Sequence, residues 1–317
     1  MSPKRAGGLF FLFVILHLLM LFLLNGIGRY IPEVYELIPS TLAAQAVILL
    51  PTLAFAMMTP APFSRMFPFR RVKIRSALLT FLMMAGLFPA VGIVNYLTTF
   101  FAENVVESSI VTETAAYPMT TMLLLVGVLG PLCEEVVFRG YIYQSLRRSG
   151  RVTGSILLSG LLFGLMHMNL NQASYAFLIG IFLAALTRAC GSLVLPILAH
   201  VSFNSFEVWM MYQTAELLPA ETSESAGLFE IEEALSAAGD AQVLLGDNPL
   251  LLALPLLLIA GFGILVAFLC LRSIERLEKN PSAKEEAKFT EKPLFGIFTV
   301  LGILFSVIFM IWVEGYL

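Results

Sequence analysis

Seven ionisable side chains lie inside long apolar stretches of this sequence, where charge is otherwise scarce. They are His17, Glu134, Glu135, Arg139, His167, His200 and Glu207. A charged side chain at the centre of a bilayer costs about 2.5–3.5 kcal/mol by insertion scales, so such residues usually face a cavity or a partner. Carboxylates, imidazoles and amides in a poorly hydrated site suit hydrolysis, which needs a base for water and donors for an oxyanion.

Two adjacent glutamates precede an arginine in the segment Glu134-Glu135-Val-Val-Phe-Arg139. On an α-helix, Arg139 lies about 40° around the axis from Glu135 and about 140° from Glu134. Because Glu followed by Arg at i+4 is a favourable pair, we expect Arg139 to neutralise Glu135. Glu134 then points elsewhere without a counter-charge and can act as a base. In the alternative, the pair is a buried strut and Glu134 caps a neighbouring backbone.

A phenylalanine and a histidine stand one helical turn apart in Phe163-Gly-Leu-Met-His167, so the aromatic ring can pack on the imidazole and fix its orientation. Gly160 and Gly164 form a small-xxx-small face that allows another helix to approach closely. A hydrogen-bonded core role for His167 remains open, since a lone histidine in a span is more often structural.

A histidine and an asparagine share one helix face in His200-Val-Ser-Phe-Asn204. Two neighbouring N–H donors can hold a developing oxyanion. Pro196 is expected to free a backbone carbonyl and to bend this helix around a cavity. The alternative for His200 and Asn204 is a hydrogen-bonded pair between helices.

The other candidates are expected to be structural. His17 stands alone among leucines, and Glu207 near the outer end of its span can reach the membrane interface. Cys133 has no base placed to ionise it. The three cysteines lie in three separate apolar blocks and form neither a disulfide framework nor a CxxC metal site.

Composition defines the setting of these residues. The chain has 317 residues, of which 58% are hydrophobic and 13% charged, against about 25% charged in soluble domains. The apolar residues form blocks long enough to cross a hydrocarbon core about 30 Å thick. We therefore expect an all-α polytopic membrane bundle of eight to nine transmembrane helices. The nine expected spans are 9–28, 41–59, 77–100, 118–146, 154–170, 172–188, 192–212, 249–271 and 294–313.

The distribution of charge predicts the orientation. With the N-terminus inside, every Lys and Arg except Arg29 and Arg139 falls on the cytoplasmic side, which is the side that basic loops prefer. The C-terminus is then extracytoplasmic. An acidic loop, 213–248, lies outside and includes a possible surface helix at 229–238, whereas the mixed-charge linker 273–293 is cytoplasmic. A net charge of −3 gives no basic surface for nucleic acid.

The three motifs together resemble the CAAX-protease and bacteriocin-processing (CPBP, or Abi) family of intramembrane proteases, which includes Rce1-type prenyl-protein endopeptidases. Glu134 to Arg139 matches EExxxR, Phe163 to His167 matches FxxxH, and His200 to Asn204 matches HxxxN, in that order. The likeness covers about 117–212, expected to be the catalytic core between the N-terminal helices 1–116 and the C-terminal helices 249–317.

The resemblance implies an endopeptidase that cleaves a membrane-associated peptide or protein in the cell membrane of a prokaryote. Glu134 would activate water with help from His167, while His200 and Asn204 would form the oxyanion hole. Glu135, Arg139 and Phe163 would support the site. No cofactor is expected, since HExxH is absent. Were a divalent metal bound, its ligands would be Glu134, His167 and His200.

Two other functions remain compatible with the sequence. A non-catalytic immunity or regulatory protein would keep the fold and bind peptides, although intact motifs argue against it. A proton-coupled transporter would use Glu134 and the histidines as a relay, but would be expected to have a repeat between its halves. Neither the substrate, nor its prenylation, nor the oligomeric state follows from the sequence.

Overall fold

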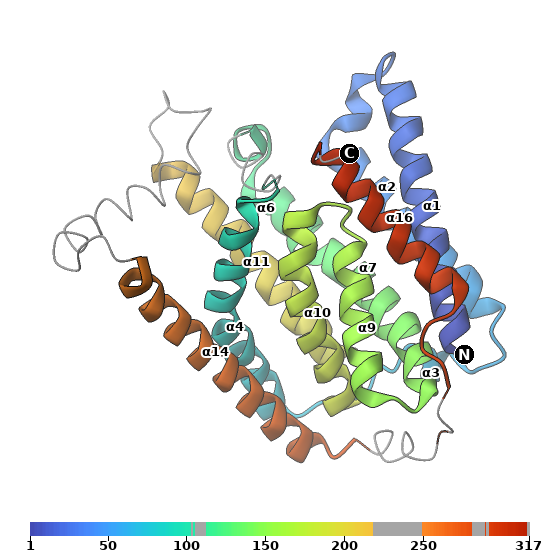
Figure 1. Cartoon of the computed structure of the whole chain (residues 1–317), viewed down its shortest axis with the longest axis vertical. Helices are drawn as coiled ribbons and strands as arrows, with labels where there is room; N and C mark the ends of the chain where they lie inside the picture. Colours follow the sequence, from blue (N-terminus) through green and yellow to red (C-terminus); the bar gives the residue numbers. More distant parts are fainter. Residues whose placement is uncertain (103, 105–111, 218–248, 281–288, 290–291, 316–317) are drawn as a thin grey trace.

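The computed structural model describes residues 1–102, 104, 112–217, 249–280, 289 and 292–315, and every regular element within these ranges is helical (Figure 1). The long helices are α1 (Pro3–Gly28), α2 (Leu37–Met57), α4 (Ile74–Thr99), α10 (Leu170–Cys190), α11 (Val194–Leu217) and α14 (Pro249–Glu278). Between α4 and α10 lie a composite helix, Met119–Ser149, and the short α9 (Val152–Leu165); α16 (Ile297–Val313) is the last helix. The minor elements are η1 (Pro32–Tyr35) and α3 (Phe63–Met66).

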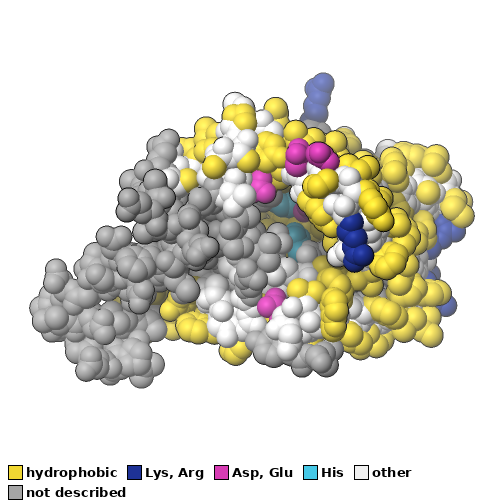
Figure 2. All heavy atoms as spheres, turned by 90° about the horizontal axis from the view of Figure 1, so that it is seen from above, with side chains coloured by type: hydrophobic (Ala, Val, Ile, Leu, Met, Phe, Trp, Pro, Cys, Tyr) yellow, Lys and Arg dark blue, Asp and Glu magenta, His cyan; other side chains and the backbone are white. Residues whose placement is uncertain are grey.

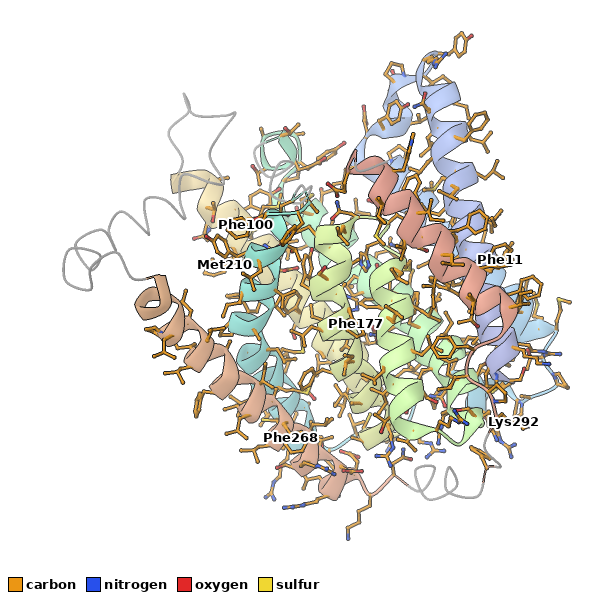
Figure 3. The ribbon with its side chains drawn as sticks, in the orientation of Figure 1. Phe11, Phe100, Phe177, Met210, Phe268 and Lys292 are labelled. Carbon is orange, nitrogen blue, oxygen red and sulfur yellow. The ribbon has the colours of Figure 1, made fainter. Side chains whose placement is uncertain are left out.

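The bundle is that of a polytopic membrane protein, as the sequence predicts. Seven helices in the described part of the chain are long and apolar enough to cross a membrane, while α9 and α16 are apolar but have only 14 and 17 residues. Many large apolar side chains are exposed on the outer surface. One of them is Phe268 of α14, which is labelled in Figure 3 and is 45% exposed. Lipid rather than water is the environment in which such a surface is stable.

Some helices extend beyond the apolar spans expected from the sequence, because polar residues continue the helix. α14 runs to Glu278, so the first residues of the expected linker 273–293 are helical. Likewise, α11 continues to Leu217 and includes the start of the segment 213–248. The expected surface helix at 229–238 lies outside the described residues.

The basic segments gather at one end of the bundle, shown at the bottom of Figure 1. The Arg5 guanidinium donates to Thr59 Oγ1 at 2.7 Å, which joins the start of α1 to the end of α2. The backbone N–H of Lys73 donates to Glu278 Oε1 at 2.9 Å, which joins α4 to the end of α14. The start of α1 lies near this end, and the end of α16 lies near the other (Figure 1).

The composite helix contains two π-helical segments around the glutamate pair. It consists of α6 (Met119–Met122), η2 (Leu123–Leu129), α7 (Gly130–Glu135), η3 (Val136–Ile142), α8 (Tyr143–Leu146) and η4 (Arg147–Ser149), of which η2 and η3 are π-helical. π-Helical turns are rare and often mark functional sites. The wider turns on both sides of α7 change the directions of side chains from those of the regular α-helix on which the predicted angles of about 40° and about 140° are based.

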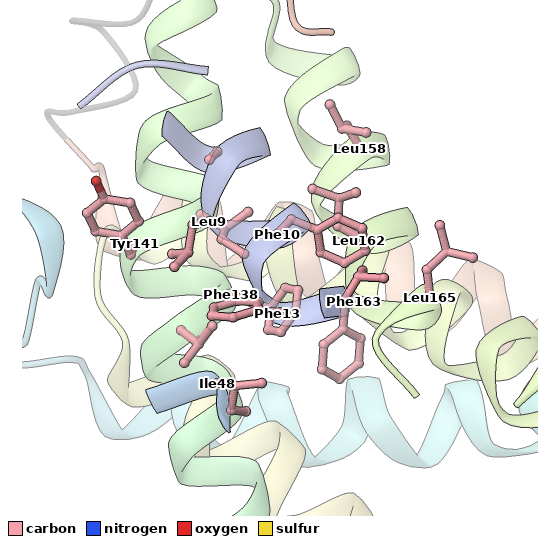
Figure 4. Packing of buried hydrophobic residues seen from close by; sticks show 14 of the residues in the cluster. Leu9, Phe10, Phe13, Ile48, Phe138, Tyr141, Leu158, Leu162, Phe163 and Leu165 are labelled. Carbon is pink, nitrogen blue, oxygen red and sulfur yellow. The ribbon is translucent and has the colours of Figure 1, made fainter. Parts of the chain in front are cut away.

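A buried apolar cluster joins this composite helix to its neighbours. Phe10 and Phe13 of α1 pack with Phe138 of η3 and Leu162 and Phe163 of α9 (Figure 4). These side chains are at most 2% exposed. The cluster therefore fixes α9 against η3, so that the residues following the glutamates and those ending α9 meet at one place.

Close packing of α9 on α10 depends on the two glycines noted in the sequence, which confirms that prediction. A Cβ at Gly160 would lie 2.9 Å from the backbone nitrogen of Ile181, and one at Gly164 would lie 2.5 Å from the Ala173 carbonyl oxygen. Both neighbours are backbone atoms, which cannot move aside as a flexible side chain can. The missing side chains therefore set the distance between α9 and α10.

We predict that Gly164→Ala lowers stability by about 1–3 kcal/mol, the usual cost of overpacking. The control is Gly261→Ala on α14, because a Cβ there has no atom within 4 Å. Thermal unfolding of both variants in the same detergent measures the difference. Equal unfolding midpoints for the two variants would contradict this account of the α9–α10 contact.

Candidate active site

Glu135 is the centre of a buried ionic cluster. Its Oε1 lies 2.8 Å from Arg139 Nη1 and 2.9 Å from His200 Nδ1, and neither Glu135 nor Arg139 has an exposed side chain. The contact with Arg139 is the one expected from the sequence, whereas the contact with His200 was not foreseen. The Glu135–Arg139 pair on the composite helix thus also holds the imidazole of α11.

The hydrogen bond to Glu135 determines how His200 presents its ring. A carboxylate paired with arginine accepts hydrogen bonds, so His200 Nδ1 is the protonated nitrogen. Its Nε2 then faces Glu134, whose Oε2 lies 3.8 Å away. One imidazole therefore stands between the two glutamates, and Glu134, which is 13% exposed, is the more accessible of the two. The expectation that Glu134 has no counter-charge holds only while His200 is neutral.

Phe163 is the common neighbour of the cationic and imidazole groups. Its ring packs edge to face with His167 and with His200, at centroid distances of 5.3 Å and 5.5 Å. The guanidinium carbon of Arg139 lies 4.2 Å from the same ring centroid. The ring contact with His167 was expected, whereas the ring contact with His200 was not. The contact with Arg139 adds a cation–π interaction. Phe163 thereby limits the rotation of both imidazoles.

His167 lies in the turn after α9 rather than within that helix. Its Nδ1 donates to the carbonyl oxygens of Phe163 at 3.0 Å and Gly164 at 3.2 Å, which are among the last carbonyls of the helix. Met168 follows with φ of 53°, a left-handed conformation that ends the helix. Because Nδ1 carries the hydrogen, His167 Nε2 retains a lone pair.

Asn204 lies one turn beyond His200 on α11 and contacts the π-helical segment η2. Its Nδ2 donates to the Val126 carbonyl oxygen at 3.3 Å, which leaves the second amide hydrogen for another acceptor. The reason for which the sequence predicted a bend at Pro196, the loss of a helical hydrogen bond, does not apply here. Pro196 stands in the first turn of α11, where no helical hydrogen bond is lost.

These side chains line one cavity of about 170 Å³ between the helices. A cavity of this size holds water when its walls are polar. Glu134, His167, His200 and Asn204 reach it from the composite helix, the end of α9 and α11. Figure 2 looks down on the end of the bundle opposite the basic segments and shows histidine side chains within a hollow, with acidic side chains around it.

Other sequence candidates take no part in the cavity. His17 and Cys133 are not among the residues that line it, and Cys133 is buried. Within the described residues, no three His, Cys, Asp or Glu side chains form a group that could hold a metal ion. Glu134, His167 and His200 thus do not have the arrangement of a three-ligand metal site, and we assign no step to a metal.

Two cavity residues were not foreseen as functional. Glu207 lines the cavity from α11, and Gln45 lines it from α2. The signal for Glu207 was present in the sequence, because a residue at i+7 from His200 returns to within about 20° of the same helix face. No pattern in the sequence indicated Gln45, because α2 is far from the composite helix and α11 along the chain.

The fold and this cavity define a polytopic membrane protein with a buried Glu/His/Asn site of the kind that can hydrolyse a bond. Residues 116–206 match the family described as "Type II CAAX prenyl endopeptidase Rce1-like". This segment carries all three motifs, and it is the part of the chain that is similar to that family.

A curated relative gives the same indication. The chain is 28% identical over 92 residues to a protein of Bacillus subtilis (strain 168) described as "Putative membrane peptidase YdiL". The similarity covers 29% of this chain and 38% of that protein. No solved structure matches the chain.

Proposed function

We propose that this protein is a membrane endopeptidase that hydrolyses a peptide bond of a membrane-associated peptide or protein through a water activated by Glu134. The observation that carries the proposal is the meeting of Glu134, His167, His200 and Asn204 at one cavity. The similarity of residues 116–206 to a family described as prenyl endopeptidases supports the same reaction class.

In the proposed reaction, Glu134 removes a proton from a water bound in the cavity, and the water oxygen attacks the peptide carbonyl carbon. The carbonyl π electrons move to oxygen, so that negative charge leaves the glutamate and appears on the tetrahedral intermediate. The C–N bond then breaks as Glu134 returns its proton to the leaving nitrogen. His167 Nε2, which is free to accept, orients the same water.

The oxyanion is held by α11 in this proposal. Doubly protonated His200 donates from Nε2, because its Nδ1–H is bonded to Glu135 Oε1 at 2.9 Å. Asn204 contributes the amide hydrogen that Val126 does not use. Since Glu135 and Arg139 neutralise each other, the charge that moves is shared between Glu134, His200 and the substrate oxygen. Donors fixed before the reaction in a poorly hydrated site stabilise such charge most.

We further propose that the end carrying the basic segments is cytoplasmic, by the preference of Lys and Arg for that side. The N-terminus is then cytoplasmic and the C-terminus extracytoplasmic, in the cell membrane of a prokaryote. The hollow in Figure 2 is seen from the end of the bundle opposite the basic segments. We therefore also propose that the substrate enters the cavity from the extracytoplasmic side or from within the bilayer. Cysteine accessibility labelling of single-cysteine variants at each end tests the orientation.

Reconstitution tests the function directly. The purified protein in nanodiscs is incubated with membrane proteins of its host, and mass spectrometry identifies new peptide termini. We expect specific cleavage sites in the presence of the wild-type protein. The same sites appearing with an Asn204→Ala protein at an undiminished rate would contradict the assigned chemistry.

We predict that Asn204→Ala lowers kcat by about 10²–10³-fold, the usual effect of removing one oxyanion donor. Because the lost bond forms mainly in the transition state, KM should change little. The control is Ser202→Ala on the same helix, since the Ser202 hydroxyl donates locally to the Ala199 carbonyl at 2.8 Å and does not line the cavity. Steady-state cleavage of one identified peptide measures both variants.

A further inference from the structure

Glu207 lies on the same face of α11 as the proposed oxyanion donors, towards the open end of the cavity. It follows His200 by seven residues, or about 10 Å along the helix axis, and Asn204 by three. Unlike the buried Glu135 and the mostly buried Glu134, Glu207 has an exposed side chain. A ligand that extends from the reacting centre along α11 therefore reaches the Glu207 carboxylate.

No lysine or arginine lines the cavity to neutralise Glu207. Its walls contain two carboxylates, those of Glu134 and Glu207, and no Lys or Arg. Arg139, the nearest arginine in the site, is already paired with Glu135. Among the described residues, no ion pair involves Glu207. A carboxylate in such a position attracts a cation.

Positive charge is scarce in the sequence of α11 and its surroundings. There is no Lys or Arg between Arg188 and Arg272, a stretch that contains α11 with Glu207 and Glu216. Arg29 is the one basic residue in the loops that the sequence predicts on the side away from the basic segments. A field of one sign around a cavity raises the local concentration of oppositely charged ligands and their rate of association.

Glu207 and Gln45 also lie outside the segment 116–206 that matches the family. Gln45 lines the cavity, and its buried Oε1 has no hydrogen-bond partner among the residues that the structure describes. The proposed catalytic residues lie within the segment that matches the family, whereas Glu207 and Gln45 lie outside it. Because they are not part of the matched segment, Glu207 and Gln45 are suited to select the substrate of this particular protein.

We infer that Glu207 is a specificity-determining residue that binds the side chain of a lysine or arginine in the substrate peptide. This inference rests on the protease function proposed above. Tyr175 of α10 lines the same cavity and offers an aromatic face beside the cation. The preferred substrate is therefore a membrane-associated peptide with a basic residue a few positions from the cleaved bond.

A lysine scan tests this inference. Quenched-fluorescent peptides built on one cleaved sequence carry lysine or the uncharged norleucine at each position in turn. With the wild-type protein in nanodiscs, kcat/KM should favour lysine at one position by about tenfold. Glu207→Gln should bring the ratio of the two rates towards one, and Glu207→Lys should favour glutamate at that position. Glu207→Asp keeps the charge and should keep a preference for lysine.

The matched control is Glu36→Gln, which removes the same charge from an exposed residue before α2, outside the cavity. Its lysine preference should equal that of the wild type. High salt should weaken the preference of the wild type, since screening reduces interactions of exposed charges. No lysine preference at any position, or a preference that survives in Glu207→Gln, overturns the inference while leaving the proposed protease function intact.

Binding separates failure of this inference from failure of the proposed function. The same lysine and norleucine peptides are titrated against the Glu134→Gln protein, in which turnover is blocked, and affinity is followed by fluorescence anisotropy. Tighter binding of the lysine peptide that disappears in the Glu134→Gln/Glu207→Gln protein supports the subsite even when no peptide is cleaved. Equal binding of the two peptides contradicts it.

Discussion

Glu134→Gln should reduce kcat/KM for an identified substrate by about 10²–10⁴-fold, the range attributed to a general base. Glutamine has nearly the same volume as glutamate but cannot accept the proton from water. The carboxylate is the accessible one of the pair, with its Oε2 3.8 Å from His200 Nε2. The loss should appear in kcat, because water activation is part of the chemical step.

The stability of the Glu134→Gln protein should stay close to that of the wild type. The ion pair of Arg139 is with Glu135. Replacing the Glu134 carboxylate therefore leaves this buried ion pair intact. Thermal unfolding and the elution profile of the variant provide this control, with Glu36→Gln as the matched loss of one carboxylate. Full cleavage by a folded Glu134→Gln protein would exclude Glu134 as the base and direct attention to His167.

Much of the architecture follows from the sequence because a bilayer imposes simple rules. Apolar length identifies the helices. The asymmetry of Lys and Arg predicts their orientation in the membrane, which stays a prediction. The expected spans 9–28 and 41–59 correspond to α1 (Pro3–Gly28) and α2 (Leu37–Met57). The exact ends were less predictable, since backbone hydrogen bonding extends a helix into water for as long as its residues tolerate it, as in the last residues of α14.

Local contacts within the site could also be predicted. Glu135 with Arg139 and Phe163 with His167 are separated by four residues, and side chains at this spacing meet on one helix face. Both contacts survive in the structure although η3 is π-helical and His167 lies in a turn. The contact of Glu135 with His200 could not be predicted, because it depends on how α11 packs against the composite helix.

The largest stability effect is expected from breaking the buried Glu135–Arg139 pair. Both side chains are fully buried, and Arg139 has only the Gly180 carbonyl at 3.3 Å and the Phe163 ring as further partners. Glu135→Gln leaves the guanidinium without its counter-ion, which costs about 3–5 kcal/mol in comparable pairs. The thermal unfolding midpoint should fall markedly.

Removing both charges should recover part of this stability but no activity. In Glu135→Gln/Arg139→Met neither charge is left uncompensated, and apolar replacement of a buried pair is often close to neutral. The combined effect should therefore be smaller than the sum of the two single effects, which a double-mutant cycle on unfolding free energies measures. Additive losses would show that the pair is not coupled.

Activity separates the structural role of the pair from its role at the site. Glu135 fixes His200 through Nδ1 at 2.9 Å, so the double variant has a stable fold in which the imidazole is no longer held by a carboxylate. Loss of that orienting partner weakens the donor that faces the oxyanion, and kcat should remain low after stability returns. If activity returned together with stability, the Glu135–Arg139 pair would serve the fold alone, and His200 would be oriented by its contact with Phe163 instead.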